Sequence, residues 1–108
     1  KIKKILCSFM PLDDYKFKPF FIKIDTEGSE HLVLEGLKKT LKKYKPVVMI
    51  EKNDINFFLI KKKLKKINYE IYSFRKEKLD KYYFKKKEHL NLICINKKAN
   101  IELINRLK

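Results

Sequence analysis

The sequence predicts an α/β fold, and three features of its central stretch support this prediction. Residues 20–24 are aromatic and β-branched apart from one lysine, a composition that suits a pleated strand. The apolar residues of the next segment recur at helical spacing: Leu34, Leu37, Leu41 and Tyr44. Pro46 ends that helix, and residues 47–50 form an unbroken apolar run, typical of a parallel strand covered on both faces. Residues 20–52 therefore form one predicted βαβ unit.

Carboxylates gather where the two predicted strands end. Asp25, Glu27 and Glu30 follow the first strand, and Gly28 permits a tight turn between strand and helix. The dipole of the following helix favours negative charge at its start, which accounts for two of the three acids without any catalytic role. Glu51 ends the second strand at the same edge of the sheet. Ligands of open parallel sheets bind beyond the carboxyl ends of the strands, so we expect a functional site there.

The segments around this unit complete one predicted domain. Residues 2–9 read as an edge strand blunted by lysines, and residues 11–15 as a short helix or turn. After the second strand, Asn53 or Asp54 is placed to cap another helix. Four residues mark the inner face of that helix: Phe57, Ile60, Leu64 and Ile67. Its lysines, between positions 61 and 66, are interpreted as a solvated face.

The C-terminal third adds two predicted strands and a helix. The strands cover residues 69–74 and 90–95, and a polar stretch lies between them. That stretch holds Tyr82, Tyr83 and Phe84, which suit either core packing or the aromatic wall of an acceptor pocket. We expect Asn100 to cap a final helix whose inward residues are Ile101, Ile104 and Leu107.

Composition limits the classes of protein to consider. The 108 residues allow one small domain, and an apolar fraction of 44% suits a folded chain. No apolar run reaches the roughly 18 residues that span a bilayer, and no secretory signal pattern is present. Cys7 and Cys94 lie in strand-like surroundings without metal-ligand spacing, which favours buried thiols in a cytoplasmic protein over a disulfide.

The net charge of +15 allows two interpretations. A strongly basic chain suits nucleic acid or an anionic membrane. Only Arg75 and Arg106 are arginines among the 28 basic residues, however, whereas nucleic-acid sites favour the forked guanidinium. The abundance of lysine, isoleucine and asparagine is typical of A+T-rich codons. We therefore interpret the charge as a composition bias and do not predict specific nucleic-acid binding.

The central stretch resembles a known enzyme family, the FkbM methyltransferases. The likeness rests on KIDTEGSE at 23–30, VLEG at 33–36 and KPVVMIE at 45–51. The steps LDD at 12–14 and NLICI at 91–95 resemble the family more loosely. The resemblance implies the Rossmann-like class I methyltransferase fold, a mostly parallel sheet with a final antiparallel strand. It also implies S-adenosylmethionine as cofactor and transfer of its methyl group, by O-methylation, to a hydroxyl of a sugar, glycan or natural product.

One part of the family pattern is absent. Class I methyltransferases hold the cofactor with a glycine-rich loop after their first strand, but this sequence has only Gly28 and Gly36 and no G-x-G. We therefore expect residues 1–108 to be the C-terminal portion of a single methyltransferase domain, with the cofactor-binding residues upstream of Lys1. On this interpretation the fragment alone is inactive and self-associates through an open sheet edge.

The resemblance suggests roles for the clustered side chains. Asp25 and Glu27 are the predicted catalytic residues: Asp25 would orient the acceptor hydroxyl or take its proton, unless it only bonds the N–H groups of its turn. Glu30, His31 and Glu51 are predicted to bind substrate. The alternatives are a charge at the helix start for Glu27 and Glu30 and, for His31, a surface histidine paired with a carboxylate.

Two further hypotheses concern a metal and a different function. Oxygen ligands from Asp25, Glu51 and Asn53 would suit Mg²⁺. His89 is interpreted as a loop residue. The alternative to an enzyme is a non-catalytic basic α/β module that binds nucleic acid, and such a module would show steeply salt-dependent binding. The oligomeric state is left open by the sequence.

Overall fold

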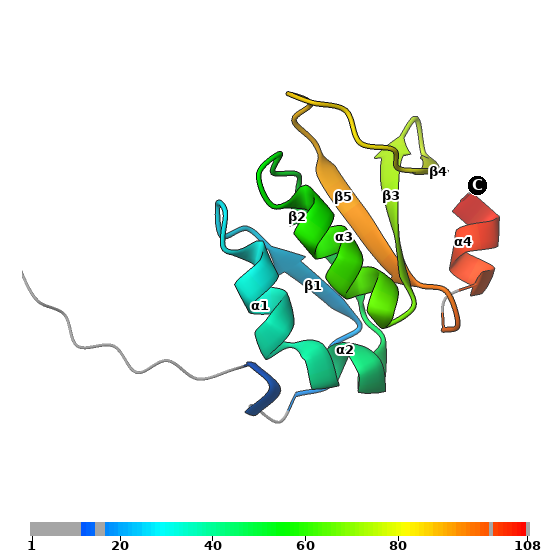
Figure 1. Ribbon diagram of the computed structural model, residues 1–108. Coiled ribbons are helices and arrows are strands. Elements are labelled where there is room, and N and C mark those ends of the chain that lie inside the picture. Colours follow the sequence, from blue (N-terminus) through cyan, green and yellow to red (C-terminus); the bar gives the residue numbers. More distant parts are fainter. Residues whose placement is uncertain (1–11, 15–16, 100, 108) are drawn as a thin grey trace, which may run out of the picture.

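Five strands and four helices form the part of the chain that the structure describes, residues 12–14, 17–99 and 101–107 (Figure 1). It is a computed structural model. The strands are β1 (Phe21–Ile24), β2 (Val47–Glu51), β3 (Tyr69–Arg75), β4 (Lys78–Lys81) and β5 (Asn91–Asn96). The helices are α1 (Glu30–Gly36), α2 (Lys38–Tyr44), α3 (Phe57–Lys66) and α4 (Ile101–Leu107), and a 3₁₀ turn covers Leu12–Asp14. The predicted strand at 2–9, including Cys7, and the predicted cap Asn100 lie outside the described residues.

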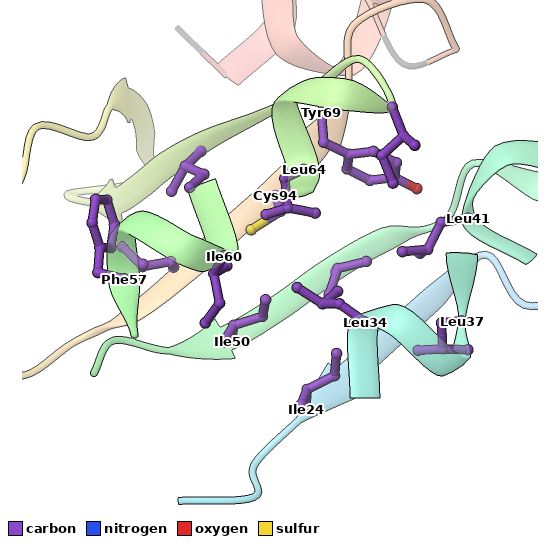
Figure 2. Close-up of a cluster of buried hydrophobic side chains, with 14 of the residues drawn as sticks. Ile24, Leu34, Leu37, Leu41, Ile50, Phe57, Ile60, Leu64, Tyr69 and Cys94 are labelled. Carbon is purple, nitrogen blue, oxygen red and sulfur yellow. The ribbon is translucent and has the colours of Figure 1, made fainter. Parts of the chain in front are cut away.

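The predicted βαβ unit is present. β1 and β2 pair in parallel, with Ile24 opposite Ile50, so the residues that follow both strands lie at one edge of the sheet. Helices α1, α2 and α3 cover one face of the sheet (Figure 1). Their apolar residues pack against those of the strands in one buried cluster, shown in Figure 2. Of the residues predicted to form the inner faces of the two helical segments, Tyr44 is half-buried. The others are buried: Leu34, Leu37, Leu41, Phe57, Ile60, Leu64 and Ile67.

The sheet is mixed, and the prediction of a mostly parallel sheet was wrong for the described strands. The strand order is β1-β2-β5-β3-β4, and only the β1–β2 pairing is parallel. β5 is antiparallel to its neighbours, as expected, and it lies between β2 and β3. Because β5 is antiparallel to both, β2 and β3 point the same way without touching. The insertion of β5 accounts for two of the three antiparallel pairings, and the β3–β4 pairing is the third.

The helix after β1 is interrupted, although the sequence predicted one continuous helix. Leu37 separates α1 from α2 with φ −107° and ψ 1°. The carboxylate of Asp13 accepts hydrogen bonds from the backbone N–H groups of Lys39 and Thr40, each at 2.8 Å. These bonds, despite partial burial, hold the pKa of Asp13 below its ordinary value. A side chain distant in sequence thus satisfies the free N–H groups that the interruption exposes at the start of α2.

The C-terminal third contains a hairpin that the sequence did not predict. β3 and β4 pair through a two-residue turn at Lys76 and Glu77, whose φ values are +50° and +62°. α4 packs on the opposite face of the sheet, where Ile104 joins a second buried cluster. Ile101 was predicted to point inward but is 62% exposed. The free thiol of Cys94 is buried, which raises its pKa to about 12. In the described part of the chain, no helix has the length and apolar character needed to cross a bilayer.

Candidate functional site

A surface pocket of about 420 Å³ lies at the carboxyl ends of β1 and β2. Its lining comes from the turn after β1, the end of β2 and its following loop, and the loop before β5. The lining residues are Glu27, Glu30, Glu51, Lys52, Asn53, Asp54, Ile55, Lys87 and His89. Since β5 runs antiparallel to β2, the loop that precedes β5 reaches this same edge of the sheet. The pocket thus occupies the edge at which the sequence predicted a site.

The turn after β1 has an unusual backbone. Glu27 has φ +49° and Gly28 has φ +113°, so two consecutive residues lie in the left-handed half of conformational space. A glutamate there is strained by comparison with a glycine. Residues held in such conformations concentrate at functional sites. The side chain of Glu27 is exposed and lines the pocket.

Glu30 holds this turn in place. Its side chain is only 1% exposed, and its carboxylate accepts the backbone N–H of Gly28 at 2.9 Å and the amide of Asn56 at 3.1 Å. The same amide group of Asn56 donates to the carbonyl oxygen of Gly28 at 3.1 Å. The Glu30 carboxylate and the Asn56 amide thereby hold the backbone of Gly28 against the start of α3. These contacts give the buried carboxylate a structural role, because both of its oxygens have donors within the fold.

Lys52 supports the opposite wall of the pocket. Its side chain is completely buried, and its ammonium forms an ion pair with Asp54. The same ammonium donates to the backbone carbonyls of Lys85 and Glu88 and lies 4.6 Å from the centre of the Phe84 ring. Buried lysines are costly unless their charge is paired and hydrogen-bonded, and Lys52 meets both conditions. It therefore ties the loop before β5 to the end of β2.

Asp54 completes the connection between these two segments. One oxygen pairs with Lys52, and the other accepts the backbone N–H of Lys87 at 2.7 Å. Those two hydrogen bonds, from Lys52 first and Lys87 second, hold the pKa of Asp54 below its ordinary value. The carboxylate is thus ionised at neutral pH, and it fixes the segment that leads to His89.

The aromatic stretch before β5 packs mainly into the core. Tyr82 is buried, and its hydroxyl donates to Glu88 at 3.0 Å. Phe84 stacks on Phe57, with ring centres 5.2 Å apart and an angle of 18° between the planes. Tyr83 is 71% exposed, and none of the three aromatic residues lines the strand-end pocket. Of the two interpretations left open by the sequence, core packing describes Tyr82 and Phe84.

The predicted site residues separate into groups. Glu27 and Glu51 are exposed and line the pocket, whereas Asp25 is exposed but is not among the lining residues. Glu30 reaches the pocket but is engaged as described above. His31 does not line the pocket, and its Nδ1 is buried without a hydrogen-bond partner, so the predicted pairing with a carboxylate is not seen at that atom.

The metal hypothesis gains no support from this arrangement. Asn53 and Glu51 line the pocket together, but Asp25 does not. The Oδ1 atom of Asn53 accepts the backbone N–H of Ile55 at 2.9 Å. Among the residues that the structure describes, no three His, Cys, Asp or Glu side chains are grouped as metal ligands. Neither Asn53 nor Asp54 caps α3 as predicted: Asn56 directly precedes that helix and makes no side-chain cap.

Five of the nine lining residues were not among the predicted site residues, and Lys52 and His89 are the two whose absence is most informative. Lys52 follows an apolar strand and looks like any of the many lysines, so its burial has no local signal. His89 was interpreted as a loop residue, which is correct, but its loop is brought to the pocket by contacts distant in sequence. Only the antiparallel pairing of β5 with β2 could have indicated its position.

Comparison with known proteins gives one match. A family model described as the methyltransferase FkbM domain matches residues 8–82 of the chain. This range includes both strands of the parallel pair and the carboxylates that follow them. No significant match was found among curated proteins or among solved structures.

Proposed function

This chain belongs to the FkbM methyltransferase domain family, and we propose that it forms the acceptor side of an S-adenosylmethionine-dependent methyltransferase. The proposed acceptor is a hydroxyl group of a sugar, glycan or other natural product. The pocket at the ends of β1 and β2 is the proposed acceptor site. The observation that carries the proposal is that Glu27 and Glu51, which follow adjacent parallel strands, line one pocket within the matched range.

Methyl transfer to an oxygen needs alignment and the removal of one proton. S-adenosylmethionine supplies an electrophilic methyl group attached to a sulfonium. A new bond forms between the acceptor oxygen and the methyl carbon, the carbon–sulfur bond breaks, and the hydroxyl proton passes to a base. Glu27 is the proposed base, because it is exposed in the pocket on a strained, fixed turn. Glu51 and His89 are proposed to orient the acceptor by hydrogen bonds.

The proposal also covers the cofactor. The sequence holds two glycines and no G-x-G, and Gly28 already serves the turn after β1. We propose that residues outside these 108 hold the methyl donor, so that the chain is one portion of a single methyltransferase domain. The shared direction of β1, β2 and β3, with the antiparallel β5 between two of them, supports a class I methyltransferase sheet.

A base substitution tests the proposal. Changing Glu27→Gln removes the proton acceptor but keeps the shape, so kcat should fall by about 10²- to 10⁴-fold. Activity would be followed as transfer of tritiated methyl to a panel of sugars, glycans and natural-product alcohols, with the product of the complete reading frame. Glu77→Gln is the matched control, since Glu77 is also an exposed glutamate with positive φ but lies in the β3–β4 turn. Equal activity of the two variants would contradict the assignment of Glu27.

A further inference from the structure

A second pocket, of about 310 Å³, lies between α3 and the β3–β4–β5 end of the sheet. It shares no lining residue with the strand-end pocket. Its lining consists of Phe57, Lys61, Lys65, Tyr69, Glu70, Ile71, Lys81, Tyr82, Tyr83 and Lys97. Four lysines and four aromatic rings therefore surround one hollow of a size at which small ligands bind.

The lysines converge on this pocket from three elements. Lys61 and Lys65 are four residues apart on α3 and therefore share one helix face. Lys81 ends β4, and Lys97 directly follows β5. The fold thus brings lysines from elements distant in sequence to the lining of one pocket.

The charge of the pocket is positive after internal pairing. Among the described residues that line it, Glu70 is the one acid. Its carboxylate pairs with Lys81 at 3.1 Å and accepts a hydrogen bond from the hydroxyl of Tyr72 at 3.1 Å. Partial burial opposes ionisation of Glu70, but these hydrogen bonds hold its pKa below the ordinary value. Within the described chain, Lys61 and Lys65 form no ion pair with a carboxylate, and Lys97 makes no direct ion pair but lies near enough to Glu70 for its charge to help lower that pKa. Four ammonium groups thus share one carboxylate, and the pocket keeps a net positive charge that suits an anion.

The aromatic residues provide an apolar floor and one accessible ring. The hydroxyl of Tyr69 donates to the carbonyl of Pro46 at 2.6 Å, and that of Tyr82 donates to Glu88. Both hydroxyls are therefore engaged elsewhere, and Phe57 and Ile71 add apolar surface. The ring of Tyr83 is 71% exposed beside this floor. An exposed aromatic ring next to cationic side chains suits a ligand in which a planar ring is joined to negatively charged groups.

We propose that this pocket binds a nucleotide: the phosphates between Lys61, Lys65 and Lys97, and the base against Tyr83. A free nucleotide and a nucleotide within a single-stranded nucleic acid share this chemistry. The proposal is independent of the proposed methyl transfer, because the methyl donor carries no phosphate and the two pockets have separate linings.

Calorimetric titration of the 108-residue chain tests this proposal. ADP should bind, while adenosine and inorganic pyrophosphate should each bind at least about tenfold more weakly, because each lacks half of the recognised chemistry. A ten-nucleotide single strand is the second arm. Tighter binding of the strand than of ADP identifies nucleic acid as the source, and weaker or equal binding identifies the free nucleotide. Failure of both to bind would overturn the proposal, as would equal affinity for ADP and pyrophosphate.

Paired triple variants separate the pocket from general attraction to a basic chain. Lys61→Gln/Lys65→Gln/Lys97→Gln should weaken ADP binding at least about tenfold. The control, Lys62→Gln/Lys66→Gln/Lys98→Gln, moves each change by one residue along the same segment and removes the same charge from exposed positions outside the pocket. It should change affinity by less than about twofold. An equal loss in both variants would overturn the proposal.

The ring contact has its own control. Tyr83→Ala should weaken ADP binding by about fivefold or more, because stacking on the base is lost, whereas Tyr83→Phe should retain it. Tyr83 is exposed, so neither change removes a core contact. Unchanged binding in the alanine variant would contradict a role for this ring. Circular dichroism of each variant would verify that it is folded.

Discussion

Lys52 joins the end of β2 to the loop before β5 and so supports the shape of the strand-end pocket. Its buried ammonium joins Asp54 to two backbone carbonyls of the loop before β5. Changing Lys52→Met should lower the free energy of unfolding by about 2–4 kcal/mol, since the carbonyls and the carboxylate lose their donor. Urea denaturation at pH 7 measures this effect. Lys62→Met, on the exposed face of α3, is the control and should stay within about 0.5 kcal/mol of the unchanged protein.

The difference in unfolding free energy between the unchanged protein and Lys52→Met should depend on pH, and the sign of that dependence follows from Asp54. The pKa of Asp54 is lowered from 3.8 in the folded chain, chiefly by the hydrogen bond from Lys52. Its contribution to stability is therefore complete above pH 3.8 and is lost as the pH falls through the lower, folded value. The gap between the unchanged protein and Lys52→Met should narrow on acidification. It should not close, because the two carbonyls still need a donor. A gap that widened at low pH would contradict this assignment.

At the scale of residues, the sequence indicated where the site lies better than what each acid does. The spacing of Glu27 and Glu51 after two apolar strands was enough to place both at one sheet edge. Glu30 has the same charge and similar spacing, yet it is buried and bonded to Gly28 and Asn56. That difference depends on Asn56, twenty-six residues further along the chain, and no local pattern contains it.

The backbone of the turn between β1 and α1 limits which residues can replace Gly28. Gly28 has φ +113°, and a Cβ added there would meet only Asn53, at an ordinary 3.9 Å. The cost of Gly28→Ala is therefore backbone strain, about 1–3 kcal/mol of unfolding free energy. Gly36→Ala is the control: Gly36 lies in α1 without positive φ, so alanine should be neutral or stabilise by up to about 1 kcal/mol. Thermal unfolding of both variants compares them, and similar effects would contradict the strain argument.

The β3–β4 hairpin offers a stabilising change. Lys76 and Glu77 both have positive φ, which ordinary side chains disfavour and which asparagine and glycine adopt readily. Replacing the pair by Asn-Gly should raise the free energy of unfolding by about 1 kcal/mol. The same replacement at Lys97 and Lys98, which also form a turn but lack positive φ, should give no such gain. Denaturant midpoints measure both, and a destabilised hairpin variant would contradict the turn assignment.

The sequence predicted the helices and strands that have a clear hydrophobic pattern. It did not predict the β3–β4 turn or the interruption of the helix at Leu37. β1, β2, α3 and β5 follow from apolar runs and helical spacing. β4 was missed because its turn contains neither glycine nor asparagine, the usual signals of such a hairpin. The interruption at Leu37 was missed because its leucine stripe continues through the break and because Asp13, which stabilises the start of α2, is distant in sequence.

For the whole molecule, the strand directions explain why a parallel sheet was expected. The sequence shows similar strand–helix–strand units, and β1, β2 and β3 do point the same way. It does not show that β5, the last strand, enters between β2 and β3. That placement also brings His89 to the strand-end pocket, so the error in topology and the missed site residue have one cause. Four of the 28 basic residues line the pocket between α3 and β3–β5, and the proposed nucleotide site rests on that grouping and not on the net charge of the chain.

The central claim is that this chain forms one portion of a methyltransferase domain whose donor is held by residues outside it. Calorimetric titration of S-adenosylhomocysteine tests it most directly, with the product of the complete reading frame and with the 108-residue chain in parallel. The claim predicts binding to the former and none to the latter. Binding to the isolated chain would contradict the divided domain, and binding to neither would contradict the role of S-adenosylmethionine.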